Sequence, residues 1–338
     1  MASIREVARI AGVSPSTVSR VMNGTANVEE NKREKVLRAI EETGFKPNEL
    51  ARALYKKSSR IIGIIVPNIE NAFFGELARA AEEEAYRNGY KVLLCNSNNN
   101  TEKELLNIHM LDQMKADGII IITNNDKTGE EISKCDLPVV VLDRELTGGS
   151  EAACIEADHY KGGILATEHL IQCGCKNIVC LRGPLEISSG QQRYRGYQAA
   201  CKKYGITEQY IDCIYDYEYG LEATKALLHK YPDVDGIIAC NDMVAISAYK
   251  ILTQAGYKVP EDIQIIGFDN IRLSWLLTPE LTTVKQPIKE MGTLAVRIIV
   301  QNGKGLPFQK QNIFDVKLIE RQTTKRKEDK KEDLPGDI

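Results

Sequence analysis

The chain has 338 residues and a mass of 37.7 kDa, which is more than one small core requires and predicts two or three domains. Hydrophobic residues make up 43% of it and charged residues 27%, and no stretch approaches the ~20 apolar residues of a membrane span, so we expect no membrane protein. The first residues mix acid and base and lack the apolar run of a secretory signal, so we expect a cytoplasmic location.

Charge is distributed unevenly along the chain. Residues 1–60 contain 12 Lys and Arg against 7 Asp and Glu, a charge of +5, whereas the whole chain carries −3, so the remainder carries −8. A basic N-terminal part on an acidic body predicts that the N-terminal part alone contacts a polyanion. Charge does not distinguish nucleic acid from a membrane surface, so the motifs decide between them.

The first predicted elements are two short helices joined by a tight turn. An apolar stripe at helical spacing predicts the first helix, and Gly12 ends it. Ser14 suits the N-cap of the second helix, and Pro15 suits its first position, where the missing N–H costs nothing. The second helix runs to Asn23, and Gly24 follows it. This arrangement predicts a helix-turn-helix.

A third helix is predicted over about residues 29–43. Val36, Leu37 and Ile40 form its apolar stripe and are expected to face inward. Three short helices bury one small core, so we assign residues 1–46 to a DNA-binding domain built on the helix-turn-helix.

The outward face of the second helix is suited to a DNA groove. Its tip is small, which lets the helix enter a major groove end-on, where Ser16 and Arg20 are able to meet base edges. Polar side chains further along suit backbone phosphates. The residues of this helix predicted to contact DNA are Ser14, Pro15, Ser16, Thr17, Ser19, Arg20 and Asn23. The alternative is a helical bundle whose polar face only meets water.

The segment IREVARIAGVSPSTVSRVMNG resembles the DNA-recognition segment of the lactose-repressor (LacI/GalR) family throughout. Residues 47–60 follow, and they contain a helix of about nine residues, which is marginal alone in water because isolated helices need ~12–15. The resemblance implies a hinge helix that orders on operator DNA and inserts a leucine into the minor groove. Leu54 occupies that position, and Tyr55 follows it where some relatives carry a basic residue.

From Ile61 onward, short β-branched runs alternate with amphipathic stretches. Two sets of buried strands are predicted, residues 61–66, 91–95, 118–123 and 138–142, then 177–181, 211–215, 236–240 and 263–268. Alternating β and α units imply parallel sheets with helices on both faces. The predicted fold class is therefore a helix-turn-helix head and an α/β body of two doubly wound lobes over residues 61–323, with a disordered charged tail at 324–338.

Polar and aromatic residues follow the predicted strands, where ligands of such sheets bind. They are Asn71, Phe73, Phe74, Asp143, Arg144, Arg193, Tyr215, Asn241, Asp269 and Gln286. Carboxylates accept from sugar hydroxyls, guanidinium groups donate to them, and aromatic rings cover the C–H side of a sugar, so the set predicts an effector-binding site for a sugar. Each residue alone has a structural alternative, such as an ion pair between Asp143 and Arg144.

The motifs around these residues are NxFF, LDR, the arginine ahead of RGY, CND, GFD and KQP. They are similar, position by position, to ribose-binding proteins and to the ribose operon repressors of Gram-positive bacteria, which are members of the lactose-repressor family, and the likeness runs from about residue 3 to 323. It implies a periplasmic-binding-protein-like body and a homodimeric, allosteric repressor on a near-palindromic operator, with D-ribose as the inducer. Another sugar, a sugar phosphate or a phosphocarrier corepressor protein is the alternative signal, and a transport-type sugar-binding protein is a remote alternative.

Two further kinds of function lack support in the sequence. Neither G-x-G-x-x-G after a strand nor a P-loop occurs, and no catalytic Ser/His/Asp or Cys/His arrangement has motif support, so we expect no enzyme, no catalytic residue and no cofactor. Nine cysteines include Cys173 and Cys175, with no C-x-x-C pair and no histidine expected beside them. We therefore predict reduced core cysteines and no metal site.

Overall fold

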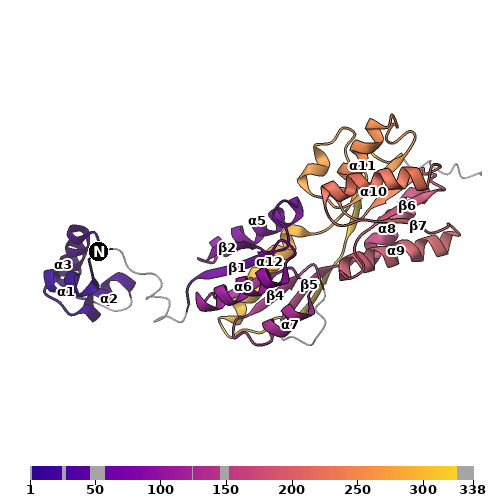
Figure 1. Ribbon diagram of the computed structural model, residues 1–338. Helices are drawn as coiled ribbons and strands as arrows, with labels where there is room; N and C mark the ends of the chain where they lie inside the picture. The colour runs from indigo at the N-terminus through magenta and orange to yellow at the C-terminus, as the bar shows by residue number, and fades with distance from the viewer. Residues whose placement is uncertain (1, 25–27, 46–57, 124, 145–151, 326–338) are drawn as a thin grey trace, which may run out of the picture. The chain divides into compact units, whose positions relative to one another are not determined.

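The structure is a computed structural model that describes residues 2–24, 28–45, 58–123, 125–144 and 152–325. The chain divides into two compact units, Met1–Ser59 and Arg60–Ile338, which are described separately (Figure 1). The predicted hinge residues Leu54 and Tyr55 lie outside the described residues. None of the helices in the described ranges is long and apolar enough to cross a bilayer.

In the N-terminal unit, α1 (Ile4–Ala11), α2 (Pro15–Asn23) and α3 (Glu30–Thr43) enclose one small core. Gly12 and Gly24 end the first two helices with φ of 67° and 62°, a left-handed conformation that glycine adopts without steric cost. The fully buried core residues are Val7, Ala8, Ala11, Val18, Val36 and Ala39. The helix-turn-helix followed by a third helix is confirmed.

One residue of the third helix was predicted on the wrong face. Leu37 is 51% exposed, whereas Val36 and Ala39 are buried. Residues three apart lie on one face of a helix, so Val36 and Ala39 share the inward face and Leu37, one position on, is rotated toward solvent. Ile40 packs against the core, as predicted.

The first lobe of the larger unit is built on a parallel sheet of six strands. In spatial order these are β11 (Gln311–Phe314), β5 (Ala153–Ala157), β4 (Val139–Leu142), β3 (Gly118–Ile121), β1 (Ile61–Val66) and β2 (Lys91–Asn96). One face is covered by α5 (Ala72–Arg87) and α12 (Ile288–Asn302), and the other by α6 (Thr101–Gln113) and α7 (Asp126–Ile132). Isoleucine and valine fill the central strands because both faces are buried.

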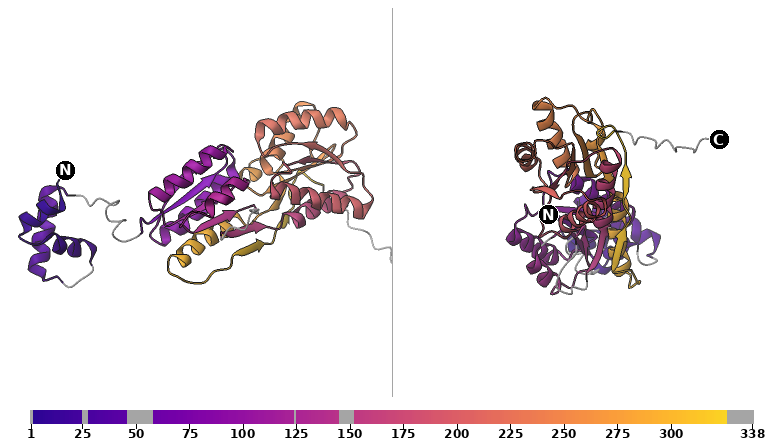
Figure 2. Two further views of the ribbon diagram at one scale, coloured as in Figure 1. Left: turned by 60° about the horizontal axis from the view of Figure 1, so that its bottom comes forward. Right: turned by 90° about the vertical axis from the view of Figure 1, so that its right-hand side faces the viewer.

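The second lobe repeats this plan with a sheet of six strands. In spatial order these are β12 (Lys317–Ile319), β10 (Thr282–Lys285), β9 (Gln264–Asp269), β8 (Gly236–Ala239), β6 (Ile178–Arg182) and β7 (Gln209–Asp212). Helices α8 (His159–Gln172) and α9 (Ser188–Tyr204) cover one face, and α10 (Tyr217–Lys230) and α11 (Asp242–Gln254) cover the other (Figure 2). A short 3-10 helix, η1 (Arg272–Trp275), follows β9. The predicted pair of doubly wound lobes is confirmed, with β12 added antiparallel at one edge.

The lobes are joined where the chain passes from β5 to α8, from β10 to α12 and from β11 to β12. Strands β5, β11 and β12 were not predicted from the sequence. Each of these strands contains a single β-branched residue, and β11 and β12 are only partly buried, so they lack the β-branched runs that marked the others. The strand expected at 211–215 is Gln209–Asp212, because the chain leaves the sheet at Cys213 and turns toward the other lobe.

Candidate functional site

The first candidate site is the exposed start of α2. Ser14 caps the helix, and its hydroxyl oxygen accepts from the Thr17 N–H at 3.2 Å and lies 2.7 Å from the Ser16 hydroxyl. Ser14, Pro15 and Ser16 are all exposed. A small, hydroxyl-rich tip of this kind is sterically able to approach base edges in a major groove.

Arg20 lies one turn further along α2 and is exposed, so its guanidinium is accessible from the same side of the helix. Thr17 and Ser19 are half-buried at the edge of this face, and Asn23 is the last residue of the helix. The structure thus places the described members of the predicted DNA-contacting set on one helix, whereas Leu54 and Tyr55 lie outside the described residues.

The second candidate site lies between the two lobes of the larger unit. One cavity is lined by nine of the ten residues predicted from the strand ends, namely Asn71, Phe73, Phe74, Asp143, Arg144, Arg193, Tyr215, Asn241 and Asp269. The tenth, Gln286, donates from Nε2 to Asp269 Oδ1 at 2.7 Å. We call this set the cleft residues. They come together because the carboxyl ends of both parallel sheets face the same cleft.

Helix caps fix two of the amide side chains of the cleft. Asn71 Oδ1 accepts from the Phe73 N–H at 3.0 Å at the start of α5, and its Nδ2 donates across the cleft to the Tyr215 carbonyl at 3.4 Å. Asn241 Oδ1 caps α11 by accepting from the Val244 N–H at 2.9 Å. Each asparagine is therefore held through its oxygen while its NH2 group faces the cleft side of its helix.

The charged cleft residues are connected through a histidine that sequence analysis missed. Asp143 faces His159, with Oδ1 3.2 Å from Nε2, and this contact replaces the ion pair with Arg144 that was considered as its structural alternative. Arg193 Nε donates to His159 Nδ1 at 3.3 Å, and Arg193 Nη2 lies 3.4 Å from Asp269 Oδ1. His159 opens α8 and is separated from β5 only by the cap residue Asp158, so its position near a strand end was missed because β5 was not predicted.

Burial and neighbouring charge shift the acid–base behaviour of these carboxyls. Burial pushes the pKa of Asp143 upward, but His159 and Arg193 outweigh it and hold that pKa below its ordinary value. For Asp269 burial dominates over the opposing effect of Arg193 and raises the pKa to about 7. Two buried aspartates of one cleft are therefore ionised to different extents near neutral pH.

Asp242, the first residue of α11, does not cap that helix. Asn241 caps α11, while the Asp242 carboxylate accepts from Thr283 Oγ1 at 2.6 Å and from the Ile271 N–H at 2.9 Å. It is fully buried, and burial together with the charge of Asp269 raises its pKa well above the ordinary value. Asp242 thus ties the ends of β8, β9 and β10 together beneath the cleft.

Aromatic rings and unsatisfied polar atoms complete the cleft. The guanidinium carbon of Arg193 lies 3.8 Å from the centroid of the Phe268 ring, and Phe73 and Phe74 meet edge to face at 5.3 Å. Among the described residues, the buried cleft atoms without a hydrogen-bond partner are Asp143 Oδ1, Arg144 Nε, His159 Nε2, Tyr215 Oη and Gln286 Oε1. Asp143 Oδ1 and His159 Nε2 are 3.2 Å apart, but the angle between them is not that of a hydrogen bond. Buried polar atoms are nearly always paired, so such atoms are available to a ligand.

The cavity enclosed by the cleft residues has a volume of only about 20 Å³, close to that of one water. It adjoins a wider cleft of about 390 Å³ that shares Asn71, Phe74, Arg144 and Tyr215 with it. The small cavity as it stands is therefore too small for a ligand larger than a water, and access to it is through the wider cleft.

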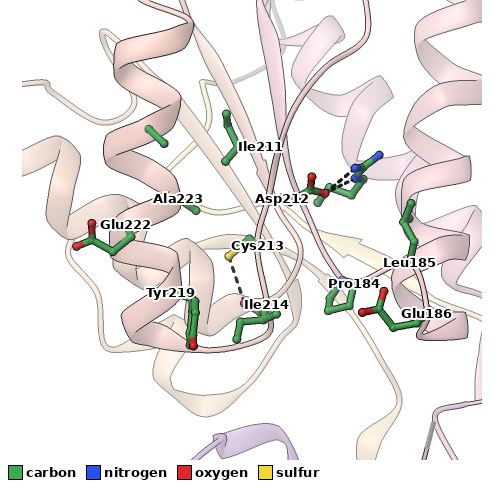
Figure 3. Close-up of a pocket in the computed structure, with 12 residues that line it drawn as sticks. Pro184, Leu185, Glu186, Ile211, Asp212, Cys213, Ile214, Tyr219, Glu222 and Ala223 are labelled. Atoms are coloured by element: carbon green, nitrogen blue, oxygen red, sulfur yellow. Dashed lines mark hydrogen bonds and ion pairs between the residues drawn. The ribbon is translucent and has the colours of Figure 1, made fainter. Parts of the chain in front are cut away.

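A larger hollow of about 620 Å³ lies at the edge of the second lobe, beside β7 and α10 (Figure 3). Its principal cation is already paired, because Arg182 lies 2.6 Å from Asp212 and stacks on the Tyr210 ring at 3.8 Å. Leu185 and Tyr219 on its rim are exposed. Without convergent buried polar groups, this hollow is a weaker candidate than the small cleft.

Cys173 and Cys175 are buried, and the expectation that no histidine lies beside them was wrong. His169 Nε2 is 3.5 Å from Cys173 Sγ, because the two residues are one turn apart on and after α8. In the described part of the chain, no group of three or more His, Cys, Asp or Glu residues is arranged to hold a metal ion.

Comparison with known proteins identifies relatives of both units. Residues 3–48 match the model of bacterial regulatory proteins of the lacI family, and residues 59–316 match that of periplasmic binding proteins and the sugar-binding domain of the LacI family. A ribose operon repressor of Bacillus subtilis is 40% identical over 331 residues, which are 97% of this chain and 100% of that protein.

Two solved structures are similar as well. A lac repressor dimer bound to operator and the anti-inducer ONPF is 27% identical, with a TM-score of 0.85, and the match covers 95% of this chain and 98% of that one. A LacI-family transcriptional regulator from Enterococcus faecium with bound ribose is 28% identical, with a TM-score of 0.71, over 78% of this chain and 98% of that one.

Proposed function

Because the chain belongs to the lacI family of bacterial regulatory proteins, we propose that it is a transcriptional repressor whose affinity for operator DNA is controlled by a small sugar, with D-ribose as the inducer. The observation that carries this proposal is the convergence of the cleft residues from both lobes on one cavity. The ribose operon repressor and the ribose-bound regulator among its relatives support the choice of sugar.

The chemistry of the cleft suits a neutral polyhydroxyl ligand. Asp143 and Asp269 offer carboxylate oxygens to sugar hydroxyls, while Arg144 and Arg193 offer a fork of donors. Phe73 and Phe74 offer ring faces and edges to the C–H side of the sugar. The two carboxyl groups and the two guanidinium groups carry opposite formal charges in equal number. An uncharged ligand therefore leaves the net charge of the cleft at zero.

The N-terminal unit supplies the DNA contact. We assign base contacts to Ser16 and Arg20, and phosphate contacts to Thr17, Ser19 and Asn23. In the domain organisation proposed, residues 1–46 bind DNA, 47–60 form the hinge with Leu54 as the minor-groove wedge beside Tyr55, 61–323 bind the sugar and dimerise, and 324–338 are a tail. The lac repressor dimer bound to operator supports a dimer on DNA, and we propose that this chain acts as a homodimer on a near-palindromic operator in the cytoplasm.

Ribose controls DNA binding if it binds one arrangement of the two lobes more tightly than the other. Ribose between the lobes favours a closed arrangement, and we propose that this arrangement separates the two hinges of a dimer and releases DNA. A ligand with equal affinity for both states shifts nothing, and moving an equilibrium from 1:99 to 99:1 requires about 10⁴-fold preference. The proposal therefore requires that the operator-bound protein bind ribose more weakly than the free protein.

Calorimetric titration with D-ribose, alongside ribose 5-phosphate, fructose and guanine, tests the ligand assignment. Ribose is expected to bind saturably, and Asp143→Asn to abolish binding, whereas Asp136→Asn at an exposed position leaves it unchanged. Failure of wild-type protein to bind ribose contradicts the ligand assignment.

A phosphorylated sugar is the second candidate, favoured by one observation. Arg144 is buried with Nε unpaired among the described residues, and burial lowers its pKa, so a phosphate oxygen would satisfy and stabilise its charge. If ribose 5-phosphate binds more tightly than ribose in the same titration, the effector is a phosphorylated sugar. A phosphocarrier protein as corepressor is tested by adding it to the operator-binding assay.

A further inference from the structure

We propose that His159 is a positioning residue for the sugar, a single imidazole that sets the orientation of Asp143 from the first lobe and of Arg193 from the second. This inference rests on the proposed function of the cleft. Nε2 of the ring lies 3.2 Å from Asp143 Oδ1, and Nδ1 accepts from Arg193 Nε at 3.3 Å.

The place of His159 in the fold explains why it reaches both partners. It is the first residue of α8, directly after the connection from β5, so it stands where the chain passes from the first lobe to the second. Asp158 caps the helix by accepting from the Lys161 N–H at 2.9 Å, which fixes the backbone at this point. The histidine side chain is 2% exposed, so its polar atoms depend on protein or ligand partners rather than bulk water.

The two contacts together specify one tautomer of the ring. Arg193 Nε is always a donor, so Nδ1 must present a lone pair, and the proton of a neutral imidazole then resides on Nε2, opposite the Asp143 carboxylate. Burial lowers the pKa of His159, although Asp143 opposes this, and the neutral ring is therefore favoured. A doubly protonated ring would direct its Nδ1–H against the Arg193 N–H.

Arg193 has little freedom once His159 is in place. Its Nη1 donates to the Cys240 carbonyl at 2.6 Å, its Nη2 faces Asp269 at 3.4 Å, and its flat face covers Phe268. The hydrogen bond from Nε to His159 Nδ1 holds the remaining nitrogen of the guanidinium group. Loss of the imidazole therefore allows the Arg193 guanidinium to rotate out of the orientation in which it donates to a sugar.

Asp143 depends on the same ring in another way. Its backbone has φ of 61°, in the left-handed region that non-glycine residues rarely adopt, and the His159 contact orients the carboxylate that this turn presents. A purely packing role for His159 is the competing explanation, because its ring also lies 5.8 Å from the Phe268 ring. The two explanations differ in what an apolar ring at this position does.

Three substitutions separate the contacts of His159. His159→Phe keeps an aromatic ring beside Phe268 and removes both polar contacts; His159→Asn keeps an acceptor near the position of Nδ1, and His159→Gln keeps a donor near that of Nε2. The matched control is His229→Phe, the same change at an exposed histidine on α10. Each protein is titrated with D-ribose by calorimetry, and its circular dichroism and melting temperature are recorded.

The proposal expects His159→Phe to weaken ribose binding at least tenfold, the two polar variants to lie between it and wild type, and His229→Phe to match wild type. In an Arg193→Lys background, whose ribose affinity is reduced but measurable, His159→Phe should cause a smaller loss than in wild type, because one of its two partners is already altered. Ribose affinity of His159→Phe equal to that of wild type overturns the proposal. If the Phe variant fails to fold, a wild-type affinity of both the Asn and Gln variants overturns it.

Nitrogen NMR of the histidine rings provides a readout that does not depend on ribose. The proposal predicts a His159 signal with the proton on Nε2 and an unprotonated Nδ1 at neutral pH, assigned by its absence in His159→Gln. A proton on Nδ1 contradicts the proposal. If wild-type protein binds no ribose while this tautomer is observed, the ligand assignment fails and the geometry of His159 stands.

Discussion

Arg193 Nη2 lies 3.4 Å from Asp269 Oδ1 at the carboxyl ends of the second lobe's strands. The two side chains are almost fully buried, and the same Asp269 oxygen accepts from Gln286 Nε2 at 2.7 Å. An arginine fork between a carboxylate and an aromatic ring is able to donate to a further oxygen in its plane, so this pair defines the floor of the proposed sugar site.

Arg193→Lys should lower ribose affinity strongly. Lysine keeps the charge but loses the fork, and truncating one member of a buried hydrogen-bonded charge pair costs about 2–5 kcal/mol. Because 1.4 kcal/mol is tenfold in affinity, the expected loss is at least about 30-fold in calorimetric titration. Arg195→Lys, two residues on and exposed, is the control that should bind normally. Normal ribose binding by Arg193→Lys would remove Arg193 from the site.

Ribose binding should depend on pH around neutrality. The pKa of Asp269 is raised to about 7 by burial, so in the unliganded protein this carboxyl is largely protonated below pH 7 and ionised above it. If hydroxyls of ribose donate to the ionised form, binding releases protons near pH 7, and affinity falls as pH is lowered from 8 to 6, by up to about tenfold per unit. Calorimetry in buffers of different ionisation enthalpy measures the protons released. Asp269→Asn should remove this pH dependence, and a wild-type affinity that is constant from pH 6 to 8 argues against an ionised Asp269 in the complex.

Arg20→Ala should weaken operator binding without altering the sugar site. A good bidentate contact from arginine to a base contributes about 1–3 kcal/mol, so fluorescence anisotropy with labelled operator should show a loss of roughly 5- to 150-fold. Arg38→Ala is the control, because this α3 side chain is 82% exposed and pairs only loosely with Glu34 at 3.8 Å. An unchanged operator affinity for Arg20→Ala would show that α2 does not present this residue to the bases.

Gly163→Ala should destabilise the second lobe. A Cβ at Gly163 would lie 2.1 Å from the Arg193 carbonyl oxygen, where α8 and α9 approach closely, so the helices must separate. Overpacking of this kind costs about 1–3 kcal/mol, to be measured by urea unfolding. Gly75→Ala provides the contrast, since a Cβ there meets nothing within 4 Å and alanine in a helix is better than glycine by about 0.5–1 kcal/mol. Equal stability of the two variants would contradict the close approach of α8 and α9.

Sequence alone predicted those parts of the fold that have a strong periodic signal. The cap residues Ser14 and Gly24 bound α2, and the continuous Ile/Val runs marked the central strands, because these strands are buried on both faces. Edge strands β11 and β12 escaped prediction because their pairing depends on neighbours distant in the chain rather than on their own composition. Leu37 was placed on the wrong face because the inward stripe of α3 is formed by Val36, Ala39 and Ile40, and Leu37 lies about 100° around the helix from Val36, outside that stripe.

The cleft shows the same division between local and long-range information. Residues directly after predicted strands, such as Asp143 and Asn241, were identified because every parallel strand presents its carboxyl end to the same edge. His159 was not, because it follows the unpredicted strand β5, and only the folded chain places it between Asp143 and Arg193. Perturbed acid–base behaviour, such as that of Asp242 and Asp269, likewise depends on burial by elements far along the chain.

The central claim is that the sugar controls DNA binding through the cleft, and the most direct test is operator affinity with and without ribose. A near-palindromic operator is first selected by the protein from random-sequence DNA, and fluorescence anisotropy then follows its release as D-ribose is added. We predict that saturating ribose lowers operator affinity of the wild-type protein, and that Arg193→Lys requires at least about 30-fold more ribose for the same release. An operator affinity of the wild-type protein that does not change between no ribose and saturating ribose would contradict the account.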